Sequence, residues 1–73
     1  MKQEAMGKME SAERAVKQIE LNKVPQAQQE NFLTIQSFLS KAKEALSIED
    51  FLRAFNLADK AQILAEELLS TIR

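Results

Sequence analysis

Apolar residues recur at alternating steps of four and three positions along the first third of the chain, the period of an amphipathic α-helix. This pattern predicts a helix over about residues 4–22, whose apolar stripe is Ala5, Met9, Ala12, Val16 and Ile19. The opposite face is predicted to be solvated, with acid–base pairs four residues apart: Glu4 with Lys8, Glu10 with Arg14 and Glu13 with Lys17. A break is predicted at NKVP, because Asn22 tolerates a left-handed helix end and Pro25 disfavours helical backbone at Val24.

A second helix is predicted over about residues 25–46, with the same spacing in Phe32, Ile35, Leu39, Ala42 and Leu46. Its end is less sharply marked. Ser47 and Asp50 are spaced like a capping box ahead of an apolar run, which favours a new helix capped by Ser47. Since neither Gly nor Pro separates Leu46 from Ser47, one unbroken helix of about 48 residues remains an alternative.

The third predicted helix, about residues 48–72, has the widest apolar surface. A complete row is formed by Phe51, Ala54, Ala58, Ala61, Ala65, Leu68 and Ile72, and it is flanked by Phe55, Leu57, Leu64 and Leu69. The apolar arc covers roughly half the circumference, more than the ~100° needed to face one neighbour. We therefore expect an all-α three-helix bundle with short connections, in which this helix packs against both others.

Three residues of the third helix raise the question of self-association. Leu52 and Ile63 fall outside the apolar arc, so they are either isolated exposed residues or the edge of an interface. Gln62 lies within the arc, either as a buried amide that fixes helix register or at the core edge with its head in water. We expect Gln62→Leu to raise stability and to broaden the distribution of oligomers.

Length and composition favour association. The 73 residues form one domain, 1–73, which buries only about 60% of its unfolded surface and is therefore marginally stable. The absence of Cys and His excludes disulfides and the common zinc sites, so only packing, a partner or a second copy can add stability. Excision of the domain from a longer chain also remains open.

The charge pattern limits the classes of binding partner and the cellular locations that we expect for this chain. The net charge is −1 and the charges are interspersed, which argues against nucleic acid. No apolar run approaches the ~18 residues of a membrane span, and the N-terminal residues lack a secretory pattern. We expect no membrane insertion and a cytoplasmic location by default, or the bacterial periplasm or envelope if a precursor signal was removed.

Catalytic constellations cannot be assembled from these residues. Without His or Cys the common acid–base and nucleophilic sites are missing, and Gly7 is the only glycine, which excludes a phosphate-binding loop. Glu66 and Glu67 are adjacent, so their side chains diverge by about 100° on a helix. We expect a non-enzyme with no cofactor, no metal and no small-molecule substrate.

The segment KAKEALSIEDFLRAFNLADKAQIL resembles one tetratricopeptide repeat, a helical hairpin, over about residues 35–68. The likeness rests on the opening pair Asp50 and Phe51 and on small residues at Ala42, Ala54 and Ala61, with Phe38 where Trp is usual. Departures are Ala45 and Ala58 in place of aromatic residues, Lys41 in place of an apolar one, and Glu66 in place of a helix-ending Pro. The resemblance implies a packing arrangement and not a peptide groove, which needs several stacked repeats.

The chain also looks like helical segments of uncharacterised bacterial proteins, some of them predicted to be exported, which implies a helical domain without catalytic residues. We expect a non-catalytic protein–protein interaction or assembly module that forms a homodimer through a face of the first and third helices. The candidate interface residues are Met9, Val16, Leu52, Gln62 and Ile63. The alternative is a spacer or scaffold domain of a larger bacterial envelope protein.

Overall fold

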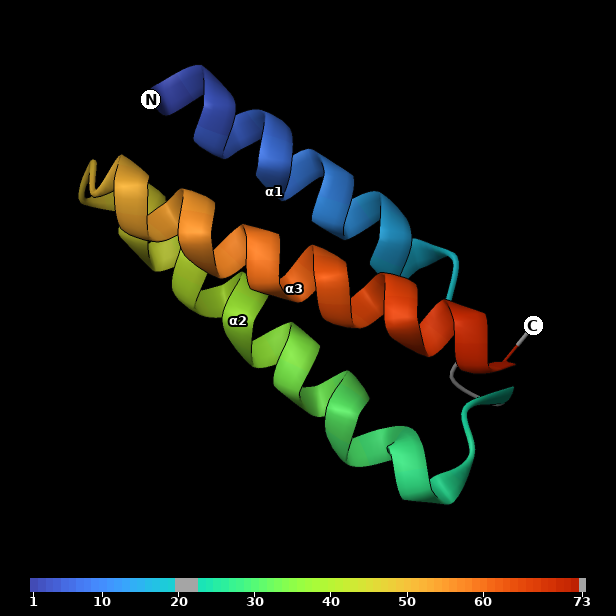
Figure 1. The fold of residues 1–73 in the computed structure, drawn as a ribbon. Helices are drawn as coiled ribbons and strands as arrows, with labels where there is room; N and C mark the ends of the chain where they lie inside the picture. Colours follow the sequence, from blue (N-terminus) through green and yellow to red (C-terminus); the bar gives the residue numbers. More distant parts are fainter. Residues whose placement is uncertain (20–22, 73) are drawn as a thin grey trace.

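A computed structural model describes residues 1–19 and 23–72, with Ile72 as backbone only. It is an all-α three-helix bundle (Figure 1), which confirms the predicted fold class. The helices are α1 (Lys2–Lys17), α2 (Gln29–Ser47) and α3 (Phe51–Ile72), and a 3-10 turn, η2 (Gln26–Gln28), precedes α2.

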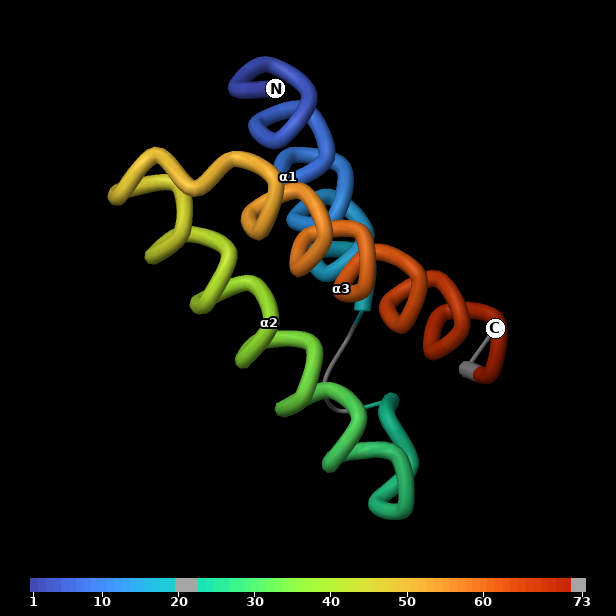
Figure 2. Tube along the Cα trace, turned by 60° about the vertical axis from the view of Figure 1, so that its left-hand side comes forward, coloured from blue at the N-terminus to red at the C-terminus, as the bar shows by residue number. Residues whose placement is uncertain are grey.

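The last helix occupies the middle of the bundle. α3 packs along both α1 and α2, whereas α1 and α2 make few contacts with each other (Figures 1 and 2). α1 runs parallel to α3 and antiparallel to α2. The Cα atoms extend over 36 × 17 × 14 Å, so the molecule is a short rod. The wide apolar arc of α3 therefore serves two neighbours, as its pattern predicted.

The centre of the core is made of alanines. On α3, the side chains that are at most 1% exposed are Ala54, Ala58, Ala61 and Ala65. Larger apolar residues flank this row, and Ile35 is the one large side chain below 2% exposure in the described part of the chain. Small side chains let helix backbones approach closely, but each contributes little buried apolar area. The core is consequently tight and thin.

The core is thinnest at the end where α2 joins α3. A separate small cluster there consists of the buried alanines Ala5, Ala45 and Ala54. Half-buried Leu46, Phe51 and Phe55 cover it. Because these larger side chains remain partly in water, this end gains less from burial than the middle of the bundle.

The first connection begins earlier than predicted. α1 ends at Lys17, where the N–H of Gln18 donates to the carbonyls of Arg14 (3.3 Å) and Ala15 (3.2 Å), and the chain tightens into a turn. Ile19 and Val24 are buried on either side of residues 20–22. The predicted role of Asn22 lies outside the described residues.

The second helix begins with a turn. Pro25, with φ −56°, precedes η2, and the N–H of Gln28 donates to the Pro25 carbonyl at 2.8 Å. The α-helix itself begins at Gln29, four residues after the predicted start. Proline's fixed φ suits either kind of helical turn, so sequence spacing did not separate the two.

The unbroken-helix alternative is wrong, because α2 ends in a Schellman motif. Glu49 has φ 61°, in the left-handed region. The N–H of Glu49 donates to the Leu46 carbonyl at 3.1 Å, and the N–H of Asp50 donates to the Ala45 carbonyl at 2.8 Å. A left-handed residue at this position reverses the chain, so α3 folds back along α2.

The predicted helix cap is also wrong in its position. Ser47 is the last residue of α2, and its hydroxyl donates to the Glu44 carbonyl at 2.6 Å. Asp50 caps α3 instead, since its Oδ1 accepts the N–H of Arg53 at 3.3 Å. The third helix thus begins at Phe51 and not at residue 48.

Candidate protein-interaction surfaces

The structure separates the five predicted interface residues. Met9 is only 5% exposed and belongs to the main core cluster, so in the folded protomer it is unavailable to a partner. Val16 and Gln62 are half-buried, whereas Leu52 and Ile63 are 62% and 48% exposed. The apolar stripe of α1 therefore faces its own bundle, and Met9 is a correction to the predicted interface.

The remaining predicted residues do not form one patch. Leu52 and Ile63 lie on the same side of α3, but eleven residues correspond to about 16 Å along the helix axis. Asn56 and Asp59 lie between them on that side. Val16 instead lines a groove towards α2. The predicted common face of the first and third helices is consequently interrupted by polar residues.

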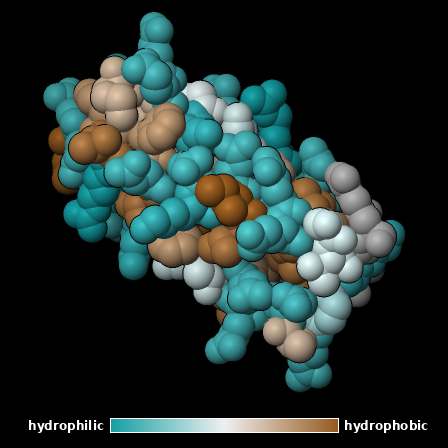
Figure 3. Space-filling view, viewed as in Figure 1, coloured by the Kyte–Doolittle hydropathy of each residue, from teal (hydrophilic) through white to brown (hydrophobic). Residues whose placement is uncertain are grey.

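A cluster of exposed apolar side chains lies at one end of the rod. We call it the apolar end and define it by Met1, Ile48 and Leu52, which are 51%, 71% and 62% exposed, together with half-buried Phe51 and Phe55. In Figure 3, brown and tan side chains gather at the upper left, where the N-terminus and the α2–α3 connection lie. Sequence reasoning found Leu52 but missed Met1 and Ile48, because residues at helix ends fall outside any periodic stripe.

A groove separates α1 from α2. Its volume is about 330 Å³, and it is lined by Glu13, Val16, Lys17, Gln36, Leu39, Ser40 and Lys43. Val16 and Leu39 pack on the main core and are its apolar residues. Glu13 and Lys17 on α1 and Lys43 on α2 supply the charges. The groove exists because both helices pack on α3 and make few contacts with each other.

The charged residues of α1 pair differently from the predicted helix pairs. Lys8 pairs with Asp59 on α3 and not with Glu4 as predicted, and its Nζ lies 3.3 Å from Asp59 Oδ1. Glu4 binds the Met1 ammonium at 3.1 Å. This hydrogen bond is the main reason that the pKa of Glu4 lies below its usual value, with smaller contributions from its own backbone and from the ammonium charge.

Neither of the other two predicted pairs, Glu10 with Arg14 and Glu13 with Lys17, forms an ion pair in the described structure. Their side chains instead line a shallow surface depression along α1. Exposed pairs of this kind contribute at most a few tenths of a kcal/mol, about 0.2–0.5, so solvation competes well with pairing.

Gln62 is half-buried on α3, one turn before Glu66, which lines a depression between α1 and α3. Its Nε2 donates to Glu66 Oε1 at 3.0 Å, while its Oε1 is buried without a hydrogen-bond partner. The depression is lined by Ser11, Arg14, Ala15, Gln18, Glu66 and Leu69. Since the amide bonds within its own helix, it does not link two helices, which removes the basis for a register role within the protomer.

Within residues 1–19 and 23–72, no group of three or more acidic side chains is placed to hold a metal ion. In the same part of the chain, none of the helices combines the length and the apolar character required to cross a bilayer. No family model, no curated protein and no solved structure matches this chain. The function is therefore inferred from the exposed surfaces of the bundle.

Proposed function

We propose that this chain is a non-catalytic helical module for protein–protein interaction and assembly, and that it pairs with a second copy of itself. One observation carries the proposal. Among residues 1–19 and 23–71, six large hydrophobic side chains remain at least 45% exposed on a protomer whose core centre is alanine: Met1, Met6, Leu33, Ile48, Leu52 and Ile63.

The energetics favour covering these residues. Fully burying one Leu, Ile or Met side chain contributes about 1.5–3 kcal/mol. A chain of 73 residues has little stability to spare, so burial of even part of this surface would raise its free energy of unfolding substantially. Association also costs free energy, because each copy loses translational and rotational freedom. The affinity therefore depends on how many of these side chains are covered together.

The test is the solution mass as a function of concentration. We expect sedimentation equilibrium to show a mass that rises from 8.3 kDa towards twice that value. The melting temperature should rise with protein concentration as well, because binding to the folded state alone stabilises it. A mass that stays monomeric at every concentration, with a sharp and concentration-independent melt, would contradict the proposal.

A second candidate is a spacer or scaffold domain of a larger bacterial envelope protein, and the rod shape supports the spacer role. The first and last described residues lie at opposite ends of the rod, whose long extent is 36 Å (Figure 1). A domain with this layout holds flanking segments apart without a partner of its own. Dyes attached near both ends should then report one fixed separation in a monomer, and a native precursor should carry an export signal.

A further inference from the structure

We propose that the groove between α1 and α2 is the docking site for a second copy of this chain, with α1 of each copy lying antiparallel against α2 of the other. This inference rests on the self-association proposed above and specifies its surface. The two-fold axis runs along the groove, so the four helices that line the interface form an antiparallel bundle and each α3 lies on its outer side.

Both walls of the groove carry residues at helical spacing. On α1, Met6, Glu13 and Lys17 are seven and four residues apart, which places them on one side of the helix. On α2 the corresponding side consists of Leu33, Gln36, Ser40 and Lys43. Met6 and Leu33, 45% and 62% exposed, thus lie towards opposite ends of the two walls. A partner in the groove covers both.

The charges of the groove are complementary to themselves under this symmetry. Because α1 and α2 are antiparallel, Glu13 lies level with Lys43 in the groove that both line. A two-fold axis along the groove brings α1 of the second copy opposite α2 at the same height. Glu13 of one copy then faces the partner's Lys43, and the symmetry produces this pair twice.

Area favours the groove over the apolar end. A stable interface covers about 800 Å² per partner. The end of the rod measures only 17 × 14 Å between its outermost Cα atoms, whereas the groove runs along the 36 Å dimension. α1 and α2, with 16 and 19 residues, present helical walls about 24 and 28 Å long. The groove face can therefore bury more surface than the end.

Charge exchange tests the arrangement. We expect Glu13→Lys and Lys43→Glu, made singly, each to weaken homodimerisation by about tenfold or more, because like charges then meet twice. Mixing the two single variants should restore association, since each copy supplies the charge that the other lacks. The double variant Glu13→Lys/Lys43→Glu should also dimerise by itself. Sedimentation equilibrium measures each case, and circular dichroism verifies that every variant is helical.

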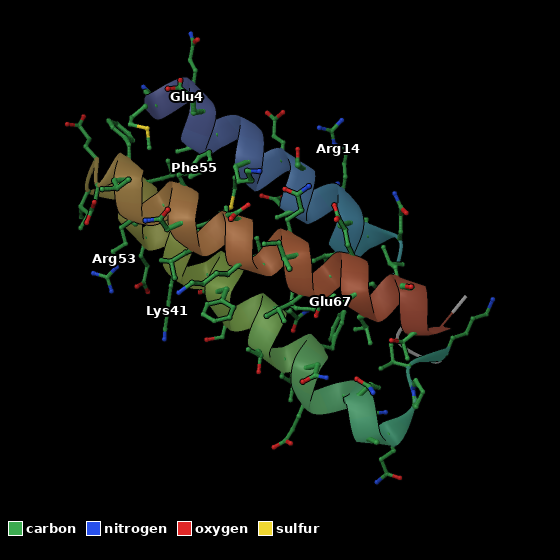
Figure 4. All side chains as sticks on the ribbon, in the orientation of Figure 1. Glu4, Arg14, Lys41, Arg53, Phe55 and Glu67 are labelled. Carbon is green, nitrogen blue, oxygen red and sulfur yellow. The ribbon has the colours of Figure 1, made fainter. Side chains whose placement is uncertain are left out.

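Lys41→Glu is the matched control. Lys41 is exposed on α2 (Figure 4), and two positions from Lys43 correspond to about 200° around the helix, away from the groove. Its replacement changes the net charge equally and should leave dimerisation within about twofold of the unaltered chain.

The outcomes separate this inference from the broader proposal. If the unaltered chain dimerises but the single exchanges leave its affinity unchanged, self-association stands and the groove arrangement is overturned. Loss of dimerisation in Ile48→Ser/Leu52→Ser, with no effect of the exchanges, would assign the interface to the apolar end. A chain that is monomeric at all concentrations overturns both proposals.

Discussion

Lys8 joins α1 to α3 through Asp59, with 3.3 Å between Nζ and Oδ1. The same ammonium lies 5.4 Å from the centroid of the Phe55 ring, so one cation contacts two residues one turn apart on α3. In Figure 4, Phe55 lies between α3 and the first turns of α1. This contact holds the helices together near the end where the core consists of alanines.

The Lys8–Asp59 interaction should be real but weak. The side chains are 27% and 42% exposed, and pairs in such positions contribute about 0.2–1 kcal/mol. We expect a double-mutant cycle of Lys8→Ala and Asp59→Ala, measured by urea unfolding, to give a coupling in this range that decreases in high salt. Lys60→Ala on the exposed side of α3 should show no coupling to Asp59→Ala. A coupling unaffected by salt would argue against an electrostatic origin.

Glu49→Gly should stabilise the protein. Glu49 occupies a left-handed conformation, φ 61°, which costs a residue with a Cβ about 1 kcal/mol and glycine much less. The greater freedom of glycine in the unfolded chain offsets part of this gain. Thermal and urea unfolding should show a net increase of a few tenths of a kcal/mol, up to about 0.5. Glu49→Ala retains the Cβ and serves as the control, and an equal gain there would exclude relief of backbone strain.

Asp50 and Ser47 should contribute differently to the free energy of unfolding. Because Asp50 Oδ1 accepts the N–H of Arg53, Asp50→Ala should lower the free energy of unfolding by about 1 kcal/mol. Ser47 bonds only to a carbonyl of its own helix, so Ser47→Ala should have an effect below about 0.5 kcal/mol. The reverse order in urea unfolding would restore Ser47 as the helix cap.

Ala58 should not tolerate a larger side chain. It is 0% exposed at the middle of α3, where the helix faces both neighbours. Ala58→Leu forces the backbones apart and should destabilise the protein by about 1–3 kcal/mol or more. Lys60→Leu introduces the same side chain on the exposed face and should cost little. Equal losses of stability in the two variants would show that close packing at Ala58 is unimportant.

Gln62→Leu should raise stability, because it removes a buried carbonyl oxygen that has no hydrogen-bond partner. The gain should be about 1 kcal/mol, since the lost bond to Glu66 is solvent-accessible and weak. As this bond lies within α3, the distribution of oligomers should remain unchanged in sedimentation equilibrium. A broader distribution would instead show that Gln62 contacts the second copy.

The sequence predicted the architecture because periodicity records which side of a helix is buried. The half-circumference apolar arc of residues 51–72 required two neighbours, and α3 packs against both. Alanines at Ala54, Ala58 and Ala61 likewise indicated close helix approach, and they form the buried row. These features depend on local spacing alone, which a linear sequence contains in full.

Tertiary structure decided the rest, because it depends on which helices meet and where the chain turns. Ser47 and Asp50 both suit a helix cap, and only the left-handed Glu49 assigns that role to Asp50. Met9 lies on the apolar stripe of α1, and only the docking of α1 on the bundle shows that the protomer itself, and not a partner, covers it. The groove between α1 and α2, and the position of Met1 and Ile48 at the same end of the rod, both involve residues that are distant in sequence. Periodicity gives each helix a buried side, but it does not determine which residues of different helices lie near one another in space.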